Sequence, residues 1–164
     1  MLYNSPAGCI YIKVSGGFIN EIIFIREEDG QTNPPPDVLS AADKKIFKKC
    51  TGQLDEYFSG KRKNFELPTR QYGTEFQQRV WNELMQIPFG KTISYLQLAK
   101  RLGDVKAIRA AASANGRNQL SIIVPCHRVI GSDGSLTGYG GGLHRKKWLL
   151  DHENKYANGV SLLF

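Results

Sequence analysis

Three reactive side chains stand in a row at Cys126, His127 and Arg128, within the stretch IIVPCHRVI of residues 122–130. A free cysteine has a pKa of about 8.5, so only a small fraction is thiolate at neutral pH. A nearby base or positive charge raises that fraction, and His127 and Arg128 are both candidates for this role. The stretch predicts a nucleophilic cysteine, against two alternatives, a metal ligand and a buried residue of the core.

The chain around Cys126 has to place it beside its activating group. The composition of residues 121–124, SIIV, predicts a short buried strand, and Pro125 ends it because proline has no N–H to donate to a sheet. Neighbours on a regular strand face opposite sides. Pairing of Cys126 with His127 therefore requires either a turn at this point or a bridging water.

A catalytic base needs a group that orients it, and Glu153 is a candidate. In the predicted helix of residues 143–154 it follows Leu149 and Leu150 by four and three positions, which places its carboxylate on their face. A carboxylate turned toward the core requires a partner, and a histidine would serve. The alternative is a frayed helix end with Glu153 in water, the more common fate of a glutamate late in a helix.

The other two cysteines suggest neither a disulfide framework nor a metal site. Cys9, Cys50 and Cys126 form an odd, sparse set without C-x-x-C spacing. Cys50 falls on the apolar stripe of a predicted helix, which favours a small buried hydrophobe. No metal is expected.

The distribution of charge indicates a polyanionic partner. Residues 1–72 hold 10 Lys and Arg against 9 Asp and Glu, whereas residues 73–164 hold 12 against 6. An excess of positive charge confined to one half favours nucleic acid as its partner, although many basic proteins bind none. The start has no signal-peptide pattern and no apolar run has membrane-spanning length, so a cytoplasmic protein without a membrane segment is expected.

The first half predicts a hairpin followed by a helix. Residues 9–25 alternate apolar and polar side chains around Gly16 and Gly17, which supply a two-residue turn. Residues 29–37, rich in proline, predict a loop, and residues 38–58 predict a helix with an apolar stripe. The stripe consists of Leu39, Ala42, Ile46, Cys50, Leu54 and Tyr57. A basic turn, a short strand and a linker are expected from residue 61 to residue 73.

The second half predicts three short helices. Two capping boxes open helices over residues 74–87 and 94–103. The boxes are Thr74 with Gln77 and Ser94 with Gln97. A third helix follows Asp104 and ends at Gly116. The second and third helices, joined by a three-residue break in the basic half, predict a helix-turn-helix.

The third helix is unusual for a reader of the major groove. Such helices usually carry several long polar side chains, whereas this one is rich in alanine and has only Lys106 and Arg109 as long cations. A thin helix approaches a duplex closely, and a single arginine could then enter it. The alternative, that small residues merely allow tight helix packing, has about equal weight.

A glycine-rich segment, GSDGSLTGYGGG, covers residues 131–142. It lacks the Lys-Ser/Thr of a P-loop and does not follow the strand, loop and helix order of a phosphate site. It is either simply a mobile loop or a means of bringing backbone amides and Tyr139 close to a flat ligand.

The stretch IIVPCHRVI resembles the active-site signature of the O6-alkylguanine-DNA alkyltransferases, also called methylated-DNA–protein-cysteine methyltransferases. Four further segments are similar to the family in order and spacing, and together they cover most of residues 73–154. These segments are FGKTISYLQLAKRLG, AIRAAASANGRN, GSLTGYGGGL and KKWLLDHE. The first half matches only in length, composition and its order of hairpin and helix.

The resemblance implies an α+β fold of two domains. Residues 1–72 would form a small ribonuclease-H-like scaffold of sheet and helix, and residues 73–164 a mainly helical domain with a winged helix-turn-helix. The implied function is direct-reversal repair: an alkyl group passes from O6 of guanine in duplex DNA to the protein's own cysteine, once per molecule. The partner would be double-stranded DNA bound by a monomer, and no cofactor is needed. Activity on O4-alkylthymine and clustering along DNA stay open.

The resemblance also implies roles for the catalytic residues. Cys126 would be the permanent alkyl acceptor, His127 would act on its thiol through a water, and Glu153 would hold the imidazole. Tyr95 would donate a proton to the departing guanine. Arg109 would enter through the minor groove and take the place of the flipped nucleotide.

The remaining implied residues shape the pocket. Asn118 would brace the turn that carries the cysteine, and Ser132 would contact DNA. Val129, together with Tyr139 and Gly140 of the glycine-rich loop, would form the alkyl and guanine pocket. The chain departs from the family at Gln119, where members generally have proline, and this departure could make the approach to the cysteine less rigid.

Three rival functions deserve comparison with this one. A Cys-His-Glu hydrolase uses the same residue types but leaves the basic helix-turn-helix unexplained. A family-related sensor of alkylated DNA would lack the cysteine. A helix-turn-helix regulator with a structural cysteine would need a better reading helix than the alanine-rich one. The alkyltransferase is therefore favoured.

Overall fold

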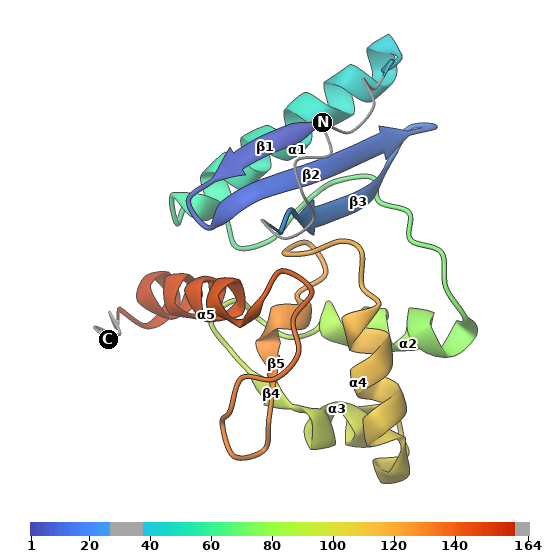
Figure 1. Ribbon diagram of the computed structural model, residues 1–164, viewed down its shortest axis with the longest axis vertical. Helices are drawn as coiled ribbons and strands as arrows, with labels where there is room; N and C mark the ends of the chain where they lie inside the picture. The colour runs from blue at the N-terminus through green and yellow to red at the C-terminus, as the bar shows by residue number, and fades with distance from the viewer. Residues whose placement is uncertain (27–37, 160–164) are drawn as a thin grey trace.

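The computed structural model describes residues 1–26 and 38–159. A three-stranded sheet and the long helix α1 (Ala41–Phe58) form one end of the molecule, and helices from the second half form the other (Figure 1). This arrangement confirms the expected α+β fold, with a small domain of sheet and helix before a mainly helical one. The loop predicted over residues 29–37 lies outside the described residues.

The sheet confirms the predicted hairpin and adds one strand to it. Strands β2 (Gly8–Ser15) and β3 (Phe18–Phe24) pair antiparallel around Gly16 and Gly17, whose φ angles are 59° and 84°. Positive φ at both central residues suits a tight hairpin turn and is cheap only for glycine. Strand β1 (Leu2–Ser5) pairs with β2 at the edge and was not predicted, because four residues carry too short a pattern.

Helix α1 packs against the sheet through the later part of the predicted stripe, since Leu39 precedes the helix and Ala42 is exposed. Ser40 caps it, accepting a hydrogen bond from the Asp43 N–H, so the helix begins three residues later than the sequence predicted. Cys50, Leu54 and Tyr57 are fully buried, which confirms the core role expected for Cys50.

The short strand predicted between residues 61 and 73 is wrong. This segment touches the sheet through a single bridge between Thr69 and Ile19 and otherwise runs as irregular chain. Its prolyl and charged residues offer too few consecutive partners for a ladder.

Three short helices follow, as the sequence predicts. They are α2 (Glu75–Leu84), α3 (Tyr95–Arg101) and α4 (Ile108–Gly116). Both capping boxes are present, with the reciprocal hydrogen bonds that the pattern requires. Helices α3 and α4 are separated by residues 102–104 and one 3-10 turn (Val105–Ala107), an arrangement consistent with a helix-turn-helix. The wing of the motif stays a prediction.

The strand predicted at residues 121–124 is also wrong. This segment is a turn, and Ile122 has a φ of 73°. Apolar composition signals burial, which is correct here, but it does not distinguish a strand from a buried turn. The parallel pair in this region consists instead of β4 (Ile93–Ser94) and β5 (Val129–Ile130).

Helix α5 (Leu143–Asn158) extends one turn past its predicted end and closes at Gly159, whose φ is 68°. It lies on the side of the helical domain that faces the sheet (Figure 1). Because the helix continues beyond it, Glu153 is not at a frayed end, and its exposed fraction is 0%. The inward orientation weighed from the sequence is the one observed.

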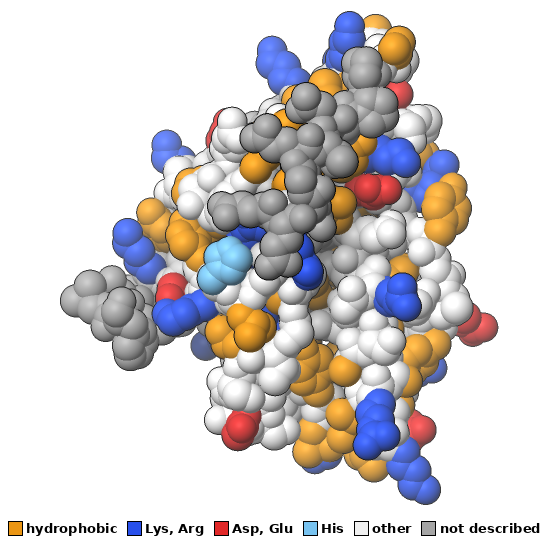
Figure 2. All heavy atoms as spheres, in the orientation of Figure 1, with side chains coloured by type: hydrophobic (Ala, Val, Ile, Leu, Met, Phe, Trp, Pro, Cys, Tyr) orange, Lys and Arg blue, Asp and Glu red, His pale blue; other side chains and the backbone are white. Residues whose placement is uncertain are grey.

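Basic side chains are scattered over the face shown in Figure 2, and some of them stand at its lower end, where α3 and α4 lie. Exposed cations on these two helices and the turn between them are Lys100, Arg101, Lys106 and Arg109. In the two described segments, no helix combines the length and apolar character needed to cross a membrane.

Candidate active site

Two very tight turns lead the chain to Cys126. The Ile123 N–H donates to the Ser121 carbonyl at 2.8 Å across Ile122, and the Cys126 N–H donates to Val124 at 2.8 Å across Pro125. Hydrogen bonds over two residues define γ-turns, and the one with positive φ at a β-branched residue is strained. One 3-10 turn (Cys126–Arg128) follows. The turn required by the sequence argument is therefore present.

Asn118 braces this turn by hydrogen bonds at both ends of its amide. Its Nδ2 donates to the Val124 carbonyl at 2.8 Å, and its Oδ1 accepts from the Leu120 N–H and from Gln71 Nε2, each at 3.1 Å. Gln71 Oε1 also accepts from the backbone N–H of Gln119 at 2.5 Å. A proline at position 119 would have no N–H for this bond, so the chain ties the approach to Cys126 with hydrogen bonds in place of a ring.

His127 and Glu153 form a buried pair. His127 Nε2 lies 2.7 Å from Glu153 Oε1, and both residues have an exposed fraction of 0%. A carboxylate only accepts, so Nε2 carries the proton of this bond. The other ring nitrogen, Nδ1, is buried and has no hydrogen-bond partner within the described segments. Nδ1 is therefore the atom free to exchange a proton with the thiol side.

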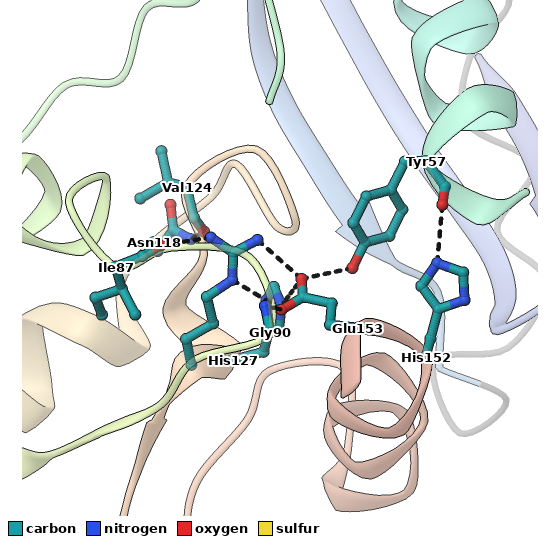
Figure 3. Close-up of polar contacts among 9 residues, drawn as sticks. Tyr57, Ile87, Gly90, Asn118, Val124, His127, His152 and Glu153 are labelled. Carbon is teal, nitrogen blue, oxygen red and sulfur yellow. Dashed lines mark hydrogen bonds and ion pairs between the residues drawn. The ribbon is translucent and has the colours of Figure 1, made fainter. Parts of the chain in front are cut away.

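Four groups besides His127 donate to Glu153, as Figure 3 shows in part. Arg128 donates through Nε to Oε2 and through Nη2 to Oε1, both at 2.9 Å. The Tyr57 hydroxyl donates to Oε1 at 2.8 Å and the Gly90 N–H to Oε2 at 3.3 Å. Burial alone would raise the pKa of Glu153, but His127 and Arg128 outweigh it and hold the pKa well below its usual range.

Cys126 lies in a cavity of about 250 Å³ between the two domains. Its exposed fraction is 5%, and burial raises the pKa of its thiol, an effect opposed by a hydrogen bond from Asn118 and the charge of Lys146. The cavity is also lined by Asn115, Asn118, Ser121, Tyr139 and Gly140 of the second half and by Ile23, Phe24 and Arg26 of the first. A thiol inside a cavity of this size suits attack on a small, enclosed group.

Two buried polar atoms in the residues lining this cavity lack partners in the described segments. They are the hydroxyl of Tyr139 and Oδ1 of Asn115, whose Nδ2 donates to the Cys126 carbonyl at 3.4 Å. Buried polar groups are nearly always hydrogen-bonded. These two atoms are therefore available to a ligand with its own donors and acceptors.

The glycine-rich loop is attached to the first half of the chain. Arg26 Nε donates to the Gly140 carbonyl at 2.7 Å, and the ring of Phe24 meets Tyr139 edge-on at 6.3 Å between centroids. A Cβ atom added at Gly141 would lie 2.9 Å from the Phe24 ring, so any larger residue at this position would push the loop away. The sheet thus sets the position of the loop over the cavity.

Lys146 is a fully buried cation close to the cysteine. Its Nζ donates to the carbonyls of Val129 at 2.7 Å and Thr137 at 2.9 Å. Burial lowers the pKa of Lys146 to about 8. It connects the strand after the cysteine to the glycine-rich loop.

The structure does not bring every predicted site residue to the cavity. Tyr95 is half-buried at the start of α3 and donates to the Thr137 carbonyl at 3.2 Å. Val129 is fully buried in β5, Ser132 is exposed in the glycine-rich loop, and Arg109 is exposed in the first turn of α4. Of the ten predicted site residues, Cys126, Asn118, Tyr139 and Gly140 line the cavity itself.

Three participants were not predicted. Tyr57 was assigned only to the core, while Asn115 and Lys146 were not singled out. The only signals in the sequence were a polar residue placed on an otherwise inward face: Asn115 next to Ala114 in α4, and Lys146 three residues before Leu149 in α5. Across residues 1–26 and 38–159 no group of three or more His, Cys, Asp or Glu is placed to hold a metal ion.

Two family models match the chain and together span most of it. One is described as 6-O-methylguanine DNA methyltransferase, ribonuclease-like domain, and matches residues 1–71. The other, the DNA binding domain of the same proteins, matches residues 75–155.

Individual proteins are similar over nearly the whole length. A methylated-DNA–protein-cysteine methyltransferase of Methanosarcina acetivorans is 49% identical over 152 residues, 93% of this chain and 96% of the relative. The protein of that name from Mycobacterium tuberculosis is 40% identical over 161 residues, 98% of this chain and 95% of the relative. A crystal structure of Mycobacterium tuberculosis OGT in complex with DNA has a TM-score of 0.82 at 39% identity, with 95% of this chain and 92% of that chain covered.

Proposed function

The chain belongs to the 6-O-methylguanine DNA methyltransferase family, and from that membership we propose which of its residues carry out the transfer. As a member it is a methylated-DNA–protein-cysteine methyltransferase, a DNA-binding protein that repairs alkylated guanine by direct reversal. The observation that carries the assignment of residues is the position of the Cys126 thiol: it lies in the cavity, next in the chain to a His127 that Glu153 holds.

Cys126 is the nucleophile and the permanent acceptor. Its proton passes through a water to Nδ1 of His127, the ring nitrogen that has no partner among the described residues. The carboxylate of Glu153 then stabilises the imidazolium that forms. The bond between the sulfur of Cys126 and the alkyl carbon forms as the bond between the alkyl carbon and O6 of guanine breaks. The product is a thioether, so each molecule reacts once.

The departing guanine takes a proton from Tyr95, and the phenolate regains one from the His127 imidazolium through solvent, so the thiol proton is finally balanced by the proton on guanine. Burial raises the pKa of Tyr95, so the phenol keeps its proton at neutral pH until the leaving base needs it. Tyr139 and Gly140 form the pocket for the base, and the hydroxyl of Tyr139 supplies a polar contact, whereas Val129, proposed for the same pocket, is fully buried in β5 and does not line the cavity.

Repair inside a duplex requires the damaged nucleotide to leave the stack. Extrusion costs a few kcal/mol, and less for a damaged pair. Arg109, exposed on α4, enters through the minor groove and fills the vacancy, while the thin alanine surface of the helix allows close approach. Ser132 and the cations of α3 and α4 contact phosphates without reading sequence.

The two parts of the chain divide the work. Residues 73–164 supply every group named in the reaction, and residues 1–72 act as the scaffold that holds the glycine-rich loop and the carboxylate. The protein acts on the genome as a monomer, which in a cell without a nucleus places it in the cytoplasm.

Intact mass spectrometry tests the proposal. The protein is incubated with excess duplex that contains one O6-methylguanine, and the peptide bearing Cys126 is mapped. We expect a stoichiometric gain of one methylene on Cys126, none in Cys126→Ala, and an unchanged gain in Cys9→Ser, which removes the half-buried thiol of β2. Methylation of another residue would show that Cys126 is not the alkyl acceptor. Repeated turnover without a mass gain would show that the protein is a hydrolase.

A further inference from the structure

A tyrosine of the first domain reaches the carboxylate of the second. The Tyr57 hydroxyl, near the end of α1, donates to Glu153 Oε1 on α5 at 2.8 Å, across 96 positions of sequence. Both residues have an exposed fraction of 0%. Figure 3 shows the phenol of Tyr57 pointing at the carboxylate of Glu153.

Tyr57 itself is held firmly. Its ring packs against Phe58, Phe65, Phe89 and His152, with centroids 5.1 to 5.9 Å apart. Its backbone carbonyl accepts a hydrogen bond from His152 Nε2 at 2.8 Å, so one residue of α1 is bonded to two consecutive residues of α5. Because both the ring and the backbone carbonyl of Tyr57 are held in place, its hydroxyl has little freedom to follow a moving carboxylate.

The carboxylate is saturated with donors. Oε1 accepts from His127, Arg128 and Tyr57, and Oε2 accepts from Arg128 and Gly90. A carboxylate offers about four lone-pair directions, so five donors leave it no room to turn. Without Tyr57, the four donors left all come from the same domain, and Arg128 competes with His127 for Oε1.

We propose that Tyr57 is a positioning residue for the alkyl transfer: it fixes Glu153 Oε1 against His127 and so lets the first domain set the reactivity of Cys126. This inference rests on the roles proposed above for Cys126, His127 and Glu153. It gives the first domain a part in the chemistry beyond support. The simpler alternative is that the hydroxyl satisfies a buried carboxylate and contributes only to stability.

Tyr57→Phe distinguishes the positioning role from the purely structural one, since it keeps the ring contacts and removes only the hydroxyl. In a single-turnover reaction with methylated duplex, the amplitude reports the folded fraction and the rate constant reports the site. We expect the rate constant to fall about 10-fold, the effect of one lost hydrogen bond to a charged group. The dissociation constant for duplex should not change, because no DNA-facing group is altered.

Tyr3→Phe is the matched control. It removes a phenol of the same domain that donates to Asp55 of the same helix at 2.6 Å and does not touch the carboxylate cluster. Its rate constant should equal that of the wild type. A loss of amplitude alone in Tyr57→Phe, at an unchanged rate constant, would overturn the positioning role and leave a structural one.

Nitrogen NMR of the histidine rings gives a second readout that a purely structural role would not move. In the wild type His127 should be in the single Nε2–H form, and Tyr57→Phe should show a mixture of both neutral forms. A fixed form in the variant would contradict the inference. If instead the wild type fails to methylate Cys126, the proposed function is wrong, whereas a wild type that reacts beside an equally fast Tyr57→Phe refutes only the role of Tyr57.

Discussion

Arg128 holds both oxygens of Glu153, with Nε to Oε2 and Nη2 to Oε1 at 2.9 Å each. Its remaining nitrogen, Nη1, donates to the Ile87 carbonyl at 2.6 Å. The sequence offered Arg128 as a direct activator of the thiol beside it. The structure directs its charge to the carboxylate instead, so Arg128 acts on the neighbouring histidine through Glu153.

Replacement of Arg128 should destabilise the protein strongly. Arg128→Met leaves the carboxylate of Glu153 buried without its fixed counter-charge, which should lower the free energy of unfolding by about 3 kcal/mol. Chemical denaturation measures this loss. Arg62→Met is the control, because the pair of Arg62 with Glu56 lies near the surface and is worth under about 1 kcal/mol. Equal, small losses in both variants would mean that the buried pair is compensated elsewhere.

The same carboxylate should make stability depend on pH in acid. Its pKa in the folded protein lies well below the value of about 4.3 in an unfolded chain. Glu153 therefore contributes stability that is complete above about pH 4.3 and is lost as the pH falls from there toward the folded pKa. The difference in unfolding free energy between wild type and Glu153→Gln should shrink from pH 7 to about pH 3. Glu56→Gln, which removes a carboxylate near the surface, is the control.

Local patterns carried most of the fold and the centre of the site. The capping boxes at Thr74 and Ser94 and the glycine pair in the hairpin each depend on contacts a few residues apart, so the sequence alone predicts them. The spacing of Glu153 from Leu149 offered the inward orientation as one of two alternatives, and a buried carboxylate had an obvious partner in His127.

The contacts between distant segments could not be predicted in this way. Helical spacing placed Tyr57 on the buried face of its helix, but nothing in the spacing says that its hydroxyl meets a residue 96 positions later. The prediction of a strand at residues 121–124, where the structure has a turn, failed for a related reason. The turn with its positive φ is flanked by two hydrogen bonds to distant groups: Asn118 Nδ2 donates to the Val124 carbonyl, and the Ser121 N–H donates to the Ile22 carbonyl of the sheet. Local propensity contains no sign of either.

Lys146 should reveal itself at alkaline pH. Burial lowers its pKa to about 8, whereas an unfolded lysine titrates at about 10.4. Between these values the unfolded chain holds the proton that the folded protein has lost, so this group's contribution to stability rises with pH across the window. Wild type should gain stability relative to Lys146→Met between about pH 8 and pH 10. Lys147→Met, which removes the exposed neighbour paired with Asp151, is the control.

Arg26 should hold the glycine-rich loop over the cavity. Arg26→Ala removes the hydrogen bond to the Gly140 carbonyl, and because the contact is exposed, the unfolding free energy should change by less than about 1 kcal/mol. Amide hydrogen exchange across residues 138–142 should accelerate, and alkyl transfer should slow. Arg70→Ala, which removes a guanidinium 3.7 Å above the ring of Phe18, leaves the loop contact intact and serves as control. Unchanged exchange would assign the order of the loop to its other contacts, among them the hydrogen bonds from Arg145 to Gly141 and from Lys146 to Thr137.

Arg109 distinguishes extrusion of the base from chemistry on it. The side chain is exposed in the first turn of α4 and does not line the cavity that contains Cys126. Arg109→Ala should slow repair in duplex by about 10-fold or more, because the cost of an unstacked base is no longer offset. Reaction with free O6-alkylguanine, which needs no extrusion, should keep its rate.

Lys100→Ala, which removes an exposed cation of α3, is the control: it should weaken duplex binding in a salt-dependent manner without this difference between substrates. Equal losses on duplex and free base in Arg109→Ala would show that the arginine supports the pocket, and the filling of the vacated stack would then fall to another residue of the alanine-rich helix.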